Sequence, residues 1–191
     1  MADPLSSAEL LTAQLPTGVS LRLLHEQNDG PVRMTQIYRR DWPVEVVPVQ
    51  WNLVNTTANT LRGVHVHRAH WDYLFVVSGE MLIGLHDMRP DSPTYRMSAQ
   101  RRLQGESPCS IAVPPGVAHG FYFASAATYF YAVSRYWTPS DELGCRWDDP
   151  GLGLSWPAEE PLLSPRDATA AGYADLMLAL AAPLDRAAGD S

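Results

Sequence analysis

The sequence predicts an all-β domain, folded as an antiparallel barrel or sandwich. Short segments rich in Val, Ile, Phe and Tyr recur along the chain, and most are bounded by Gly, Pro, Asp or Ser. The 16 prolines and 13 glycines are scattered among these segments, so they mark turns and define no linker. Helical periodicity is convincing only near the C-terminus.

Eight segments are candidates for strands, and one later segment is a candidate for a helix. The strand candidates, in chain order, are Val19–Leu24, Met34–Tyr38, Val44–Val54, Tyr73–Val77, Met81–His86, Ser110–Val113, Phe121–Phe123 and Thr128–Arg135. Ser78 and Gly79 join two of them and predict a hairpin, because glycine can take the positive φ of a tight turn. The i, i+3, i+4, i+7 spacing of four apolar residues between Tyr173 and Leu180 predicts a peripheral helix.

Length and composition describe a globular protein that does not bind nucleic acid in general. The 191 residues are 46% hydrophobic and 18% charged, which is enough to bury a core. We expect a single domain over 1–191, with a loosely held N-terminal extension at 1–14 and a C-terminal helix and tail at 168–191. The net charge of −7 argues against general binding to nucleic acid or anionic membranes, which needs clustered Lys and Arg.

The expected compartment is the cytoplasm. The first residues carry no basic start followed by an apolar run, so no signal peptide is expected. No stretch is apolar over the length of a membrane span. Cys109 and Cys145 lie far apart without the spacing of a metal or redox motif, and we interpret them as free thiols in a reducing environment.

Five side chains that can move protons, bind anions or bind metals stand within eleven positions. They are Arg62, His65, His67, His70 and Asp72, just before an apolar segment at the mouth of the predicted barrel. Histidine titrates near neutral pH, which suits a base that removes a proton beside a carbonyl. Histidine and aspartate are also common metal ligands. The residues favour proton abstraction without excluding metal binding.

Five sequence blocks resemble one enzyme family. TLRGVHVH, LHDMRPDSPTY, PPGVAHGF, YFYAVSRYWTPSDELGCRWDDPGLGLSWP and LLSPRD occur in this order. Together they resemble the dTDP-4-dehydrorhamnose 3,5-epimerases, a cupin-fold family of sugar-nucleotide enzymes, from about Val47 to Asp167. The resemblance implies a cupin-type jelly roll, or double-stranded β-barrel. It also implies an isomerase that epimerises a 4-keto-6-deoxy sugar nucleotide at C3, at C5 or at both.

The resemblance assigns the catalytic roles to three residues. By motif, His65 is the base, Tyr131 returns a proton on the opposite face, and Asp167 orients the histidine. A carboxylate that holds one tautomer of a histidine base is chemically reasonable in itself. Each residue also has a plainer interpretation. His65 could bond backbone, Tyr131 could be a core tyrosine, and Asp167 could cap the final helix.

The resemblance also implies a set of substrate-binding residues and a homodimer. Arg62 is the candidate for binding the diphosphate or the developing enolate, because guanidinium pairs well with phosphate, although a structural ion pair is the plainer alternative. Gln50, Asn52 and His119 match positions that line the family's pocket. In the family an N-terminal Arg-Gly-Phe run holds the nucleotide across a subunit interface. Here NDGPVRMTQIY stands in its place, and Arg33 is the candidate substitute.

Two pocket residues depart from the family. The family usually has Gln two residues after the base and Lys further on, where this chain has His67 and Asp72. At ~4 Å and an effective dielectric near 20, changing Lys to Asp alters the energy of a developing oxyanion by several kcal/mol. Such a change should damage catalysis unless another group compensates for it.

Two alternatives to an epimerase without a cofactor therefore stay open. His65, His67, Asp72 and His119 are close to the ligand set of metal-binding cupins, so a metal-dependent oxygenase or isomerase with Fe, Mn, Ni or Zn is one alternative. A divalent cation plus Asp72 has the net charge of one lysine, but a metal-bound His65 could not also be the free base. The other alternative is a sugar-nucleotide binding protein without catalysis.

Overall fold

The computed structural model describes residues 15–138 and 141–182, and two five-stranded antiparallel sheets dominate this part of the chain. In the first sheet the strand order is β1 (Ser20–Leu23), β9 (Cys109–Val113), β6 (Asp72–Ser78), β11 (Ala127–Val133) and β4 (Gln50–Thr56). In the second it is β12 (Leu143–Gly144), β5 (Thr60–Val66), β10 (Val117–Phe123), β7 (Glu80–Asp87) and β8 (Ser98–Gln104). The predicted antiparallel β architecture is confirmed.

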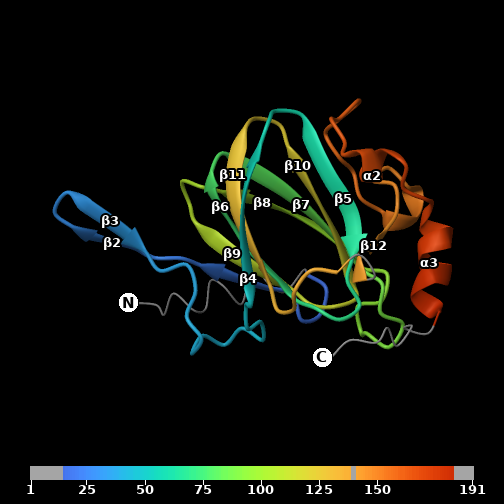
Figure 1. Ribbon diagram of the computed structural model, residues 1–191, viewed down its shortest axis with the longest axis horizontal. Coiled ribbons are helices and arrows are strands. Elements are labelled where there is room, and N and C mark those ends of the chain that lie inside the picture. Colours follow the sequence, from blue (N-terminus) through green and yellow to red (C-terminus); the bar gives the residue numbers. More distant parts are fainter. Residues whose placement is uncertain (1–14, 139–140, 183–191) are drawn as a thin grey trace.

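The two large sheets face each other across the main core, as Figure 1 shows. Leu74 and Val76 from β6 and Tyr129 from β11 belong to the same buried cluster as Ile83 and Phe123 from the second sheet. Strand β6 is also covered on its other side, where Tyr73 and Phe75 belong to a second buried cluster. A strand buried on both faces needs a continuous apolar run, which explains the sequence YLFVV.

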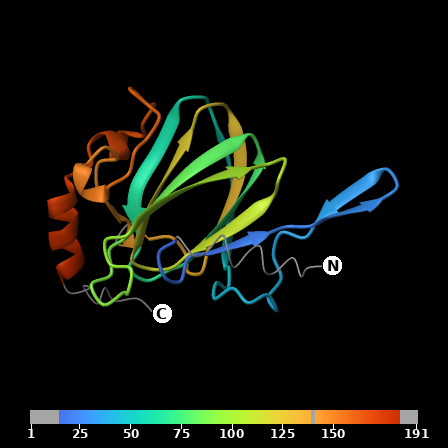
Figure 2. The same cartoon turned by 180° about the vertical axis from the view of Figure 1, so that it is seen from behind.

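A hairpin of strands β2 (Glu26–Asp29) and β3 (Val32–Thr35) extends away from the sheets, as Figure 2 shows. Its side chains are mostly exposed, including the apolar Val32 and Met34. The strand predicted at 34–38 therefore begins earlier and ends at Thr35. Because no other strand of the described residues pairs with this hairpin, its two exposed apolar side chains are candidates for contact with another molecule.

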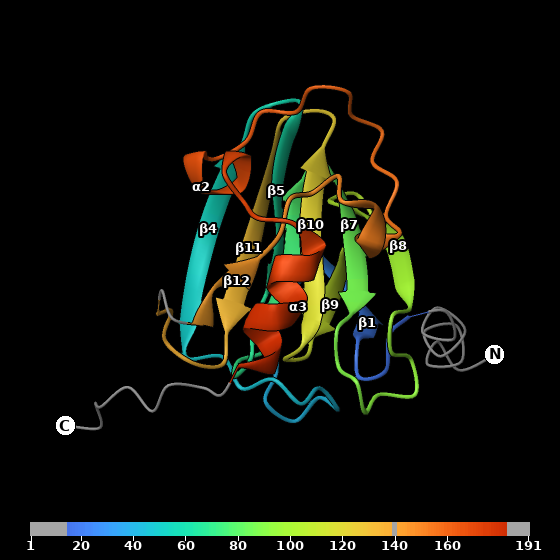
Figure 3. The ribbon, with the colours of Figure 1, turned by 90° about the vertical axis from the view of Figure 1, so that its right-hand side faces the viewer.

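Helices cover the outer face of the second sheet. The short elements η2 (Pro150–Leu152) and α2 (Pro165–Ala168) precede α3 (Tyr173–Ala181), and Figure 3 shows α3 lying in front of this sheet. Leu176 of α3 packs in one buried cluster with Leu152, Val64 and Ala118. None of the helices in the described ranges is long and apolar enough to cross a membrane. The predicted extension at 1–14 and the tail from 183 lie outside the described residues.

Some strand predictions fail for identifiable reasons. The predicted strand at 44–54 is a strand only from Gln50, because Pro48 cannot donate a backbone hydrogen bond to a ladder. Strand β8 lies at a sheet edge and reads SAQRRLQ, so no apolar run marks it. The predicted hairpin at Ser78 and Gly79 is wrong, because β6 pairs with β9 and β11 whereas β7 pairs with β8 and β10. That turn is a corner between the two sheets.

A bulge in β5 determines which of its side chains face the interior. Phe121 pairs with Arg62 and His119 pairs with His65, so three steps along β5 match two steps along β10. Residues three apart on a regular strand point to opposite faces, but one extra residue brings them to the same face. Gly63 is that extra position, with a φ of 105°. The bulge therefore directs both Arg62 and His65 inward.

Replacing Gly63 with Ala is expected to lower the free energy of unfolding by about 2–4 kcal/mol. Alanine at this position would have to adopt a positive φ, which L-residues rarely do. Its Cβ would lie 2.9 Å from both the Cα of Gly120 and the carbonyl oxygen of His119. Urea denaturation measures the change. Gly30→Ala is the matched control, since Gly30 also has a positive φ but nothing lies within 4 Å of a Cβ added there. Equal losses in the two variants would contradict the close-packing argument.

Candidate active site

A cavity of about 340 Å³ lies between the two sheets. Residues of both sheets and of the segment after β11 form its wall. They are Gln50, Arg62, His65, His67, His70, Asp72, Leu74, His119, Phe121, Tyr129, Tyr131, Val133, Trp137, Glu142 and Arg166. Most of the residues singled out in the sequence thus meet in one cavity.

His65 and Asp167 form a hydrogen-bonded pair at this cavity. The His65 Nε2 atom lies 2.6 Å from Asp167 Oδ1, and Ser164 Oγ donates to Asp167 Oδ2 at 2.8 Å. The side chain of Asp167 is 3% exposed, and that of His65 is 16% exposed. Burial alone would raise the pKa of the Asp167 carboxyl, but the hydrogen bonds from His65 and Ser164 outweigh it and hold that pKa below its usual range. An anionic Asp167 accepts the proton on Nε2, which leaves Nδ1 of His65 as the basic nitrogen.

The segment that carries Asp167 is held beside β5 by backbone contacts. Leu61 donates its backbone N–H to the carbonyl of Leu162 at 3.0 Å, and Thr60 and Leu162 form a parallel bridge. Ser164 is the N-cap of α2, and its Oγ accepts from the backbone N–H of Asp167. The N-cap of the final helix α3 is Gly172, so Asp167 does not cap that helix, and its carboxylate is instead hydrogen-bonded to His65 and Ser164.

Tyr131 belongs to the opposite wall of the cavity. It stands on β11 in the first sheet, whereas His65 stands on β5 in the second sheet. Burial raises the pKa of the Tyr131 phenol, and the nearby Arg62 only partly opposes this. The phenol is therefore protonated at neutral pH and can donate a proton. A base and an acid thus border one cavity from different sheets.

Arg62 offers a positive charge to the cavity. Its Nη1 donates to the hydroxyl of Tyr129 at 3.1 Å, and no carboxylate among the described residues forms an ion pair with it. Burial would lower the pKa of the guanidinium, but its neighbours, chiefly Tyr129, outweigh that and raise it. Arg62 is therefore always charged, and it donates a hydrogen bond to a neutral group, the Tyr129 hydroxyl. This arrangement suits an anionic ligand and does not support the structural ion pair.

The other predicted substrate-binding residues lie in or beside the cavity, except Arg33. Gln50 and His119 line the cavity. Asn52 lies beside Gln50, whose Nε2 donates to Asn52 Oδ1 at 3.0 Å. The buried Nδ2 of Asn52 has no hydrogen-bond partner within residues 15–138 and 141–182. Arg33 lies on the β2–β3 hairpin, outside this cavity, 3.8 Å from Glu26 and largely exposed. The chain does not bring Arg33 to its own site.

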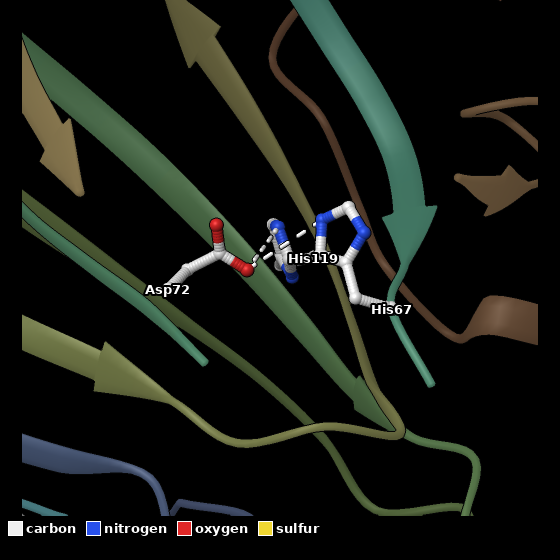
Figure 4. Close-up of side chains that lie close together, drawn as sticks. All are labelled: His67, Asp72 and His119. Atoms are coloured by element: carbon white, nitrogen blue, oxygen red, sulfur yellow. Dashed lines mark ion pairs between the residues drawn. The ribbon is translucent and has the colours of Figure 1, made fainter. Parts of the chain in front are cut away.

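His67, Asp72 and His119 converge on one point of the cavity wall, as Figure 4 shows. Asp72 Oδ2 lies 3.5 Å from His67 Nε2 and 3.7 Å from His119 Nε2, and all three residues are buried. Burial, and next the neighbouring His70, lowers the pKa of His67 to about 4. Burial also lowers the pKa of His119, and it raises the pKa of Asp72 to about 7. We call these three residues the His–Asp–His cluster.

His65 is not part of that cluster. Of the four residues in the alternative metal set, three lie together and His65 lies with Asp167. A second group of possible ligands is His67, His70 and Asp141. Its members are already hydrogen-bonded, since His70 Nδ1 lies 2.6 Å from Asp141 Oδ2.

Sequence reasoning missed several residues of the cavity. Tyr129, Tyr131 and Val133 follow the period of two that places residues on one face of a strand, so Tyr129 could have been found from this pattern. Glu142 and Arg166 form an ion pair at the cavity wall. Nothing in the sequence marks that pair, because the two residues meet only through the path of the chain after β11.

The fold and the site define a class of protein: a two-sheet β protein whose cavity holds a His–Asp pair opposite a tyrosine. The chain matches the family model of dTDP-4-dehydrorhamnose 3,5-epimerase over residues 33–175, and it belongs to that family. The resemblance inferred from the sequence blocks is confirmed.

Individual relatives agree with this assignment. The chain is 32% identical over 169 residues to the dTDP-4-dehydrorhamnose 3,5-epimerase of Neisseria gonorrhoeae. The matched region covers 83% of this chain and 51% of that protein. The chain thus spans about half the length of that relative.

Two solved structures agree on the fold. The 4-keto-6-deoxy sugar epimerase of the novobiocin biosynthetic gene cluster of Streptomyces spheroides has a TM-score of 0.79 at 28% identity, covering 89% of this chain and 90% of that one. The second is the dTDP-6-deoxy-D-glucose-3,5-epimerase of Legionella pneumophila in complex with dTDP-4-keto-L-rhamnose. It has a TM-score of 0.75 at 27% identity, and the match covers 83% of this chain and 92% of that one. The predicted cupin-type jelly roll is confirmed.

Proposed function

We propose that this chain, acting as a single domain, epimerises a 4-keto-6-deoxy sugar nucleotide at C3, at C5 or at both. The observation that carries the proposal is that His65, hydrogen-bonded to Asp167, and Tyr131 line one cavity from strands of different sheets. A family member from Legionella pneumophila binds a 4-keto sugar nucleotide, which supports the substrate class.

The proposed chemistry is proton removal on one face of the sugar and proton return on the other. Nδ1 of His65 takes the proton from the carbon next to the C4 ketone, and the electron pair moves to the C4 oxygen to form an enolate. Asp167 stabilises the imidazolium that results. The hydroxyl of Tyr131 then donates a proton to the opposite face, which inverts the carbon. Exchange with solvent restores the proton of each residue.

These proton transfers need no cofactor, because His65 and Tyr131 supply both the base and the acid. Arg62 binds the diphosphate, since it carries a positive charge and its hydrogen bond goes to the neutral Tyr129 hydroxyl. The metal-dependent oxygenase or isomerase was expected to use His65 together with His67, Asp72 and His119. We do not adopt it as the function, because His65 Nε2 is bonded to Asp167 and His65 lies apart from the other three residues, as the base of an epimerase requires.

We also propose that the protein works as a homodimer. Strand β4 is an edge of the first sheet, and its outward side chains include the exposed apolar Trp51 and Leu53. Pairing with a second copy would cover this edge and the projecting β2–β3 hairpin. Arg33 on that hairpin would then reach the nucleotide of the neighbouring subunit. Analytical ultracentrifugation that finds only monomers at micromolar concentration would contradict this arrangement.

We place this activity in the cytoplasm. Cys109 and Cys145 are both free thiols, as a reducing compartment allows.

Incubation with a dTDP-4-keto-6-deoxyhexose in heavy water tests the function. We expect deuterium to enter the sugar at C3, at C5 or at both, detected by mass spectrometry and by proton NMR. Deuterium would mark each carbon at which the base acts. A sugar nucleotide that raises the melting temperature without any deuterium exchange would instead identify a binding protein without catalysis.

A further inference from the structure

In the His–Asp–His cluster, Asp72 Oδ2 and two imidazole nitrogens face one another, and no hydrogen bond among the described residues joins them. The distances of 3.5 and 3.7 Å from Asp72 Oδ2 to the two Nε2 atoms exceed the usual hydrogen-bond range. His70 Nε2 is further away, at 3.9 Å. The three side chains come from different strands or strand ends, since His67 follows β5, Asp72 begins β6 and His119 lies within β10. The convergence is therefore a product of the fold and not of one local turn.

The protonation of the two imidazoles follows from their other contacts. His67 Nδ1 lies 3.2 Å from the backbone carbonyl of Asp141, and His119 Nδ1 lies 3.2 Å from the backbone carbonyl of Val117. A carbonyl oxygen only accepts hydrogen bonds, so each Nδ1 carries the hydrogen of a neutral ring. Each Nε2 then presents a lone pair to Asp72. When Asp72 is ionised, these three buried acceptors repel one another unless a positive charge lies among them. The neighbouring His70 does not lie among them, because its Nδ1 is hydrogen-bonded to Asp141 and its Nε2 is 3.9 Å from Asp72 Oδ2.

The two oxygen–nitrogen distances fit ligands of one metal ion, and all three ligand atoms lie within 4.8 Å of one another. Ligand atoms about 2.0–2.2 Å from a tetrahedral ion lie about 3.3–3.6 Å from one another. The distances of 3.5 and 3.7 Å between the oxygen and the two nitrogens are close to this range. Histidine ligands also commonly donate their second ring nitrogen to a carbonyl, as both do here. The arrangement therefore has both the ligand atoms and the supporting contacts of a metal site.

We propose that His67 Nε2, Asp72 Oδ2 and His119 Nε2 bind one divalent transition-metal ion at the wall of the cavity. Two imidazoles and one carboxylate suit an ion of the series from manganese to zinc. His65 remains with Asp167, so the proposed base is not used as a ligand. The role of the ion rests on the proposed function: when bound, a divalent cation supplies a Lewis acid that polarises a carbonyl oxygen. This would offset the negative charge that Asp72 adds to the cavity.

Metal analysis and Co²⁺ binding test the site independently of activity. The full chain, purified without a polyhistidine tag and without chelator, is expected to contain one divalent transition-metal ion per chain. After chelation and dialysis, added Co²⁺ should give visible absorption bands that saturate at one equivalent and that Zn²⁺ displaces. His67→Gln and Asp72→Asn should each weaken Co²⁺ binding by at least about 100-fold. His65→Asn is the matched control, because it removes an imidazole of the same cavity and should leave binding unchanged.

Several outcomes would overturn the proposal. A chelated wild type that binds neither Co²⁺ nor Zn²⁺ would show that a shared proton supplies the positive charge instead. Loss of binding in His65→Asn equal to that in His67→Gln would reject the three-residue assignment. Circular dichroism of each variant separates loss of a ligand from loss of folding.

Deuterium exchange separates the metal site from the proposed function. If metal binds but chelation leaves deuterium exchange unchanged, the ion has no role in the reaction, and the proposed function is retained. If metal binds and no exchange occurs, the site stands and the function fails.

Discussion

Replacing His65 with Asn is expected to abolish deuterium exchange at the sugar carbons, with a rate loss on the order of 10³-fold or more. The substitution removes the imidazole whose Nε2 is paired to Asp167 and whose Nδ1 is the proposed base. Asparagine keeps a polar side chain of similar size but cannot accept a proton from carbon. The loss should appear in the rate of deuterium entry, measured by mass spectrometry at saturating sugar nucleotide.

The control for this prediction is a histidine outside the cavity. His25 is exposed and does not line the cavity, so His25→Asn should exchange at the rate of the wild type. Binding of the nucleotide, measured by calorimetry, should survive in His65→Asn, because Arg62 and the cavity wall remain. Exchange at the normal rate in a folded His65→Asn protein would reject His65 as the base.

A strand could be predicted from the sequence where both of its faces are buried, because its residues are then apolar throughout. Strand β6 is buried on both sides, so its apolar run YLFVV is visible without a structure. Strand β8 has no such signal, because only Leu103 of its seven residues is buried. The hairpin at Ser78 and Gly79 was predicted wrongly, because a glycine turn has the same local sequence whether its strands pair or enter different sheets. Pairing is a tertiary property that a turn does not encode.

The site residues could be predicted only where they lie in sequence blocks that resemble those of the family. Asp167 stands 102 residues after His65, and only the resemblance connected the two. The inward direction of both Arg62 and His65 depends on the bulge at Gly63, which alternation along a strand would have excluded. The tautomer of His67 depends on the backbone carbonyl of Asp141, which lies 74 residues later in the chain. No residue pattern reports such contacts.

Replacing Tyr131 with Phe is expected to separate inversion from exchange. The variant lacks the phenolic proton donor but keeps the ring and the His65–Asp167 pair on the other wall. His65 should still remove the proton and return a solvent deuteron to the same face of the sugar. We expect deuterated substrate of unchanged configuration, while the rate of epimerised product falls by roughly 10²–10⁴-fold. Proton NMR of the recovered sugar measures both quantities in one sample.

Tyr129→Phe is the matched control for this prediction, since Tyr129 lines the same cavity two residues earlier on β11. Its hydroxyl accepts a hydrogen bond from Arg62, so its loss should weaken nucleotide binding and leave inversion intact. Equal loss of inversion in both variants would mean that neither hydroxyl is the specific donor. Inversion at the normal rate in Tyr131→Phe would remove Tyr131 from the mechanism. Loss of both exchange and inversion in that variant alone would show that the phenol, and not His65, takes the proton first.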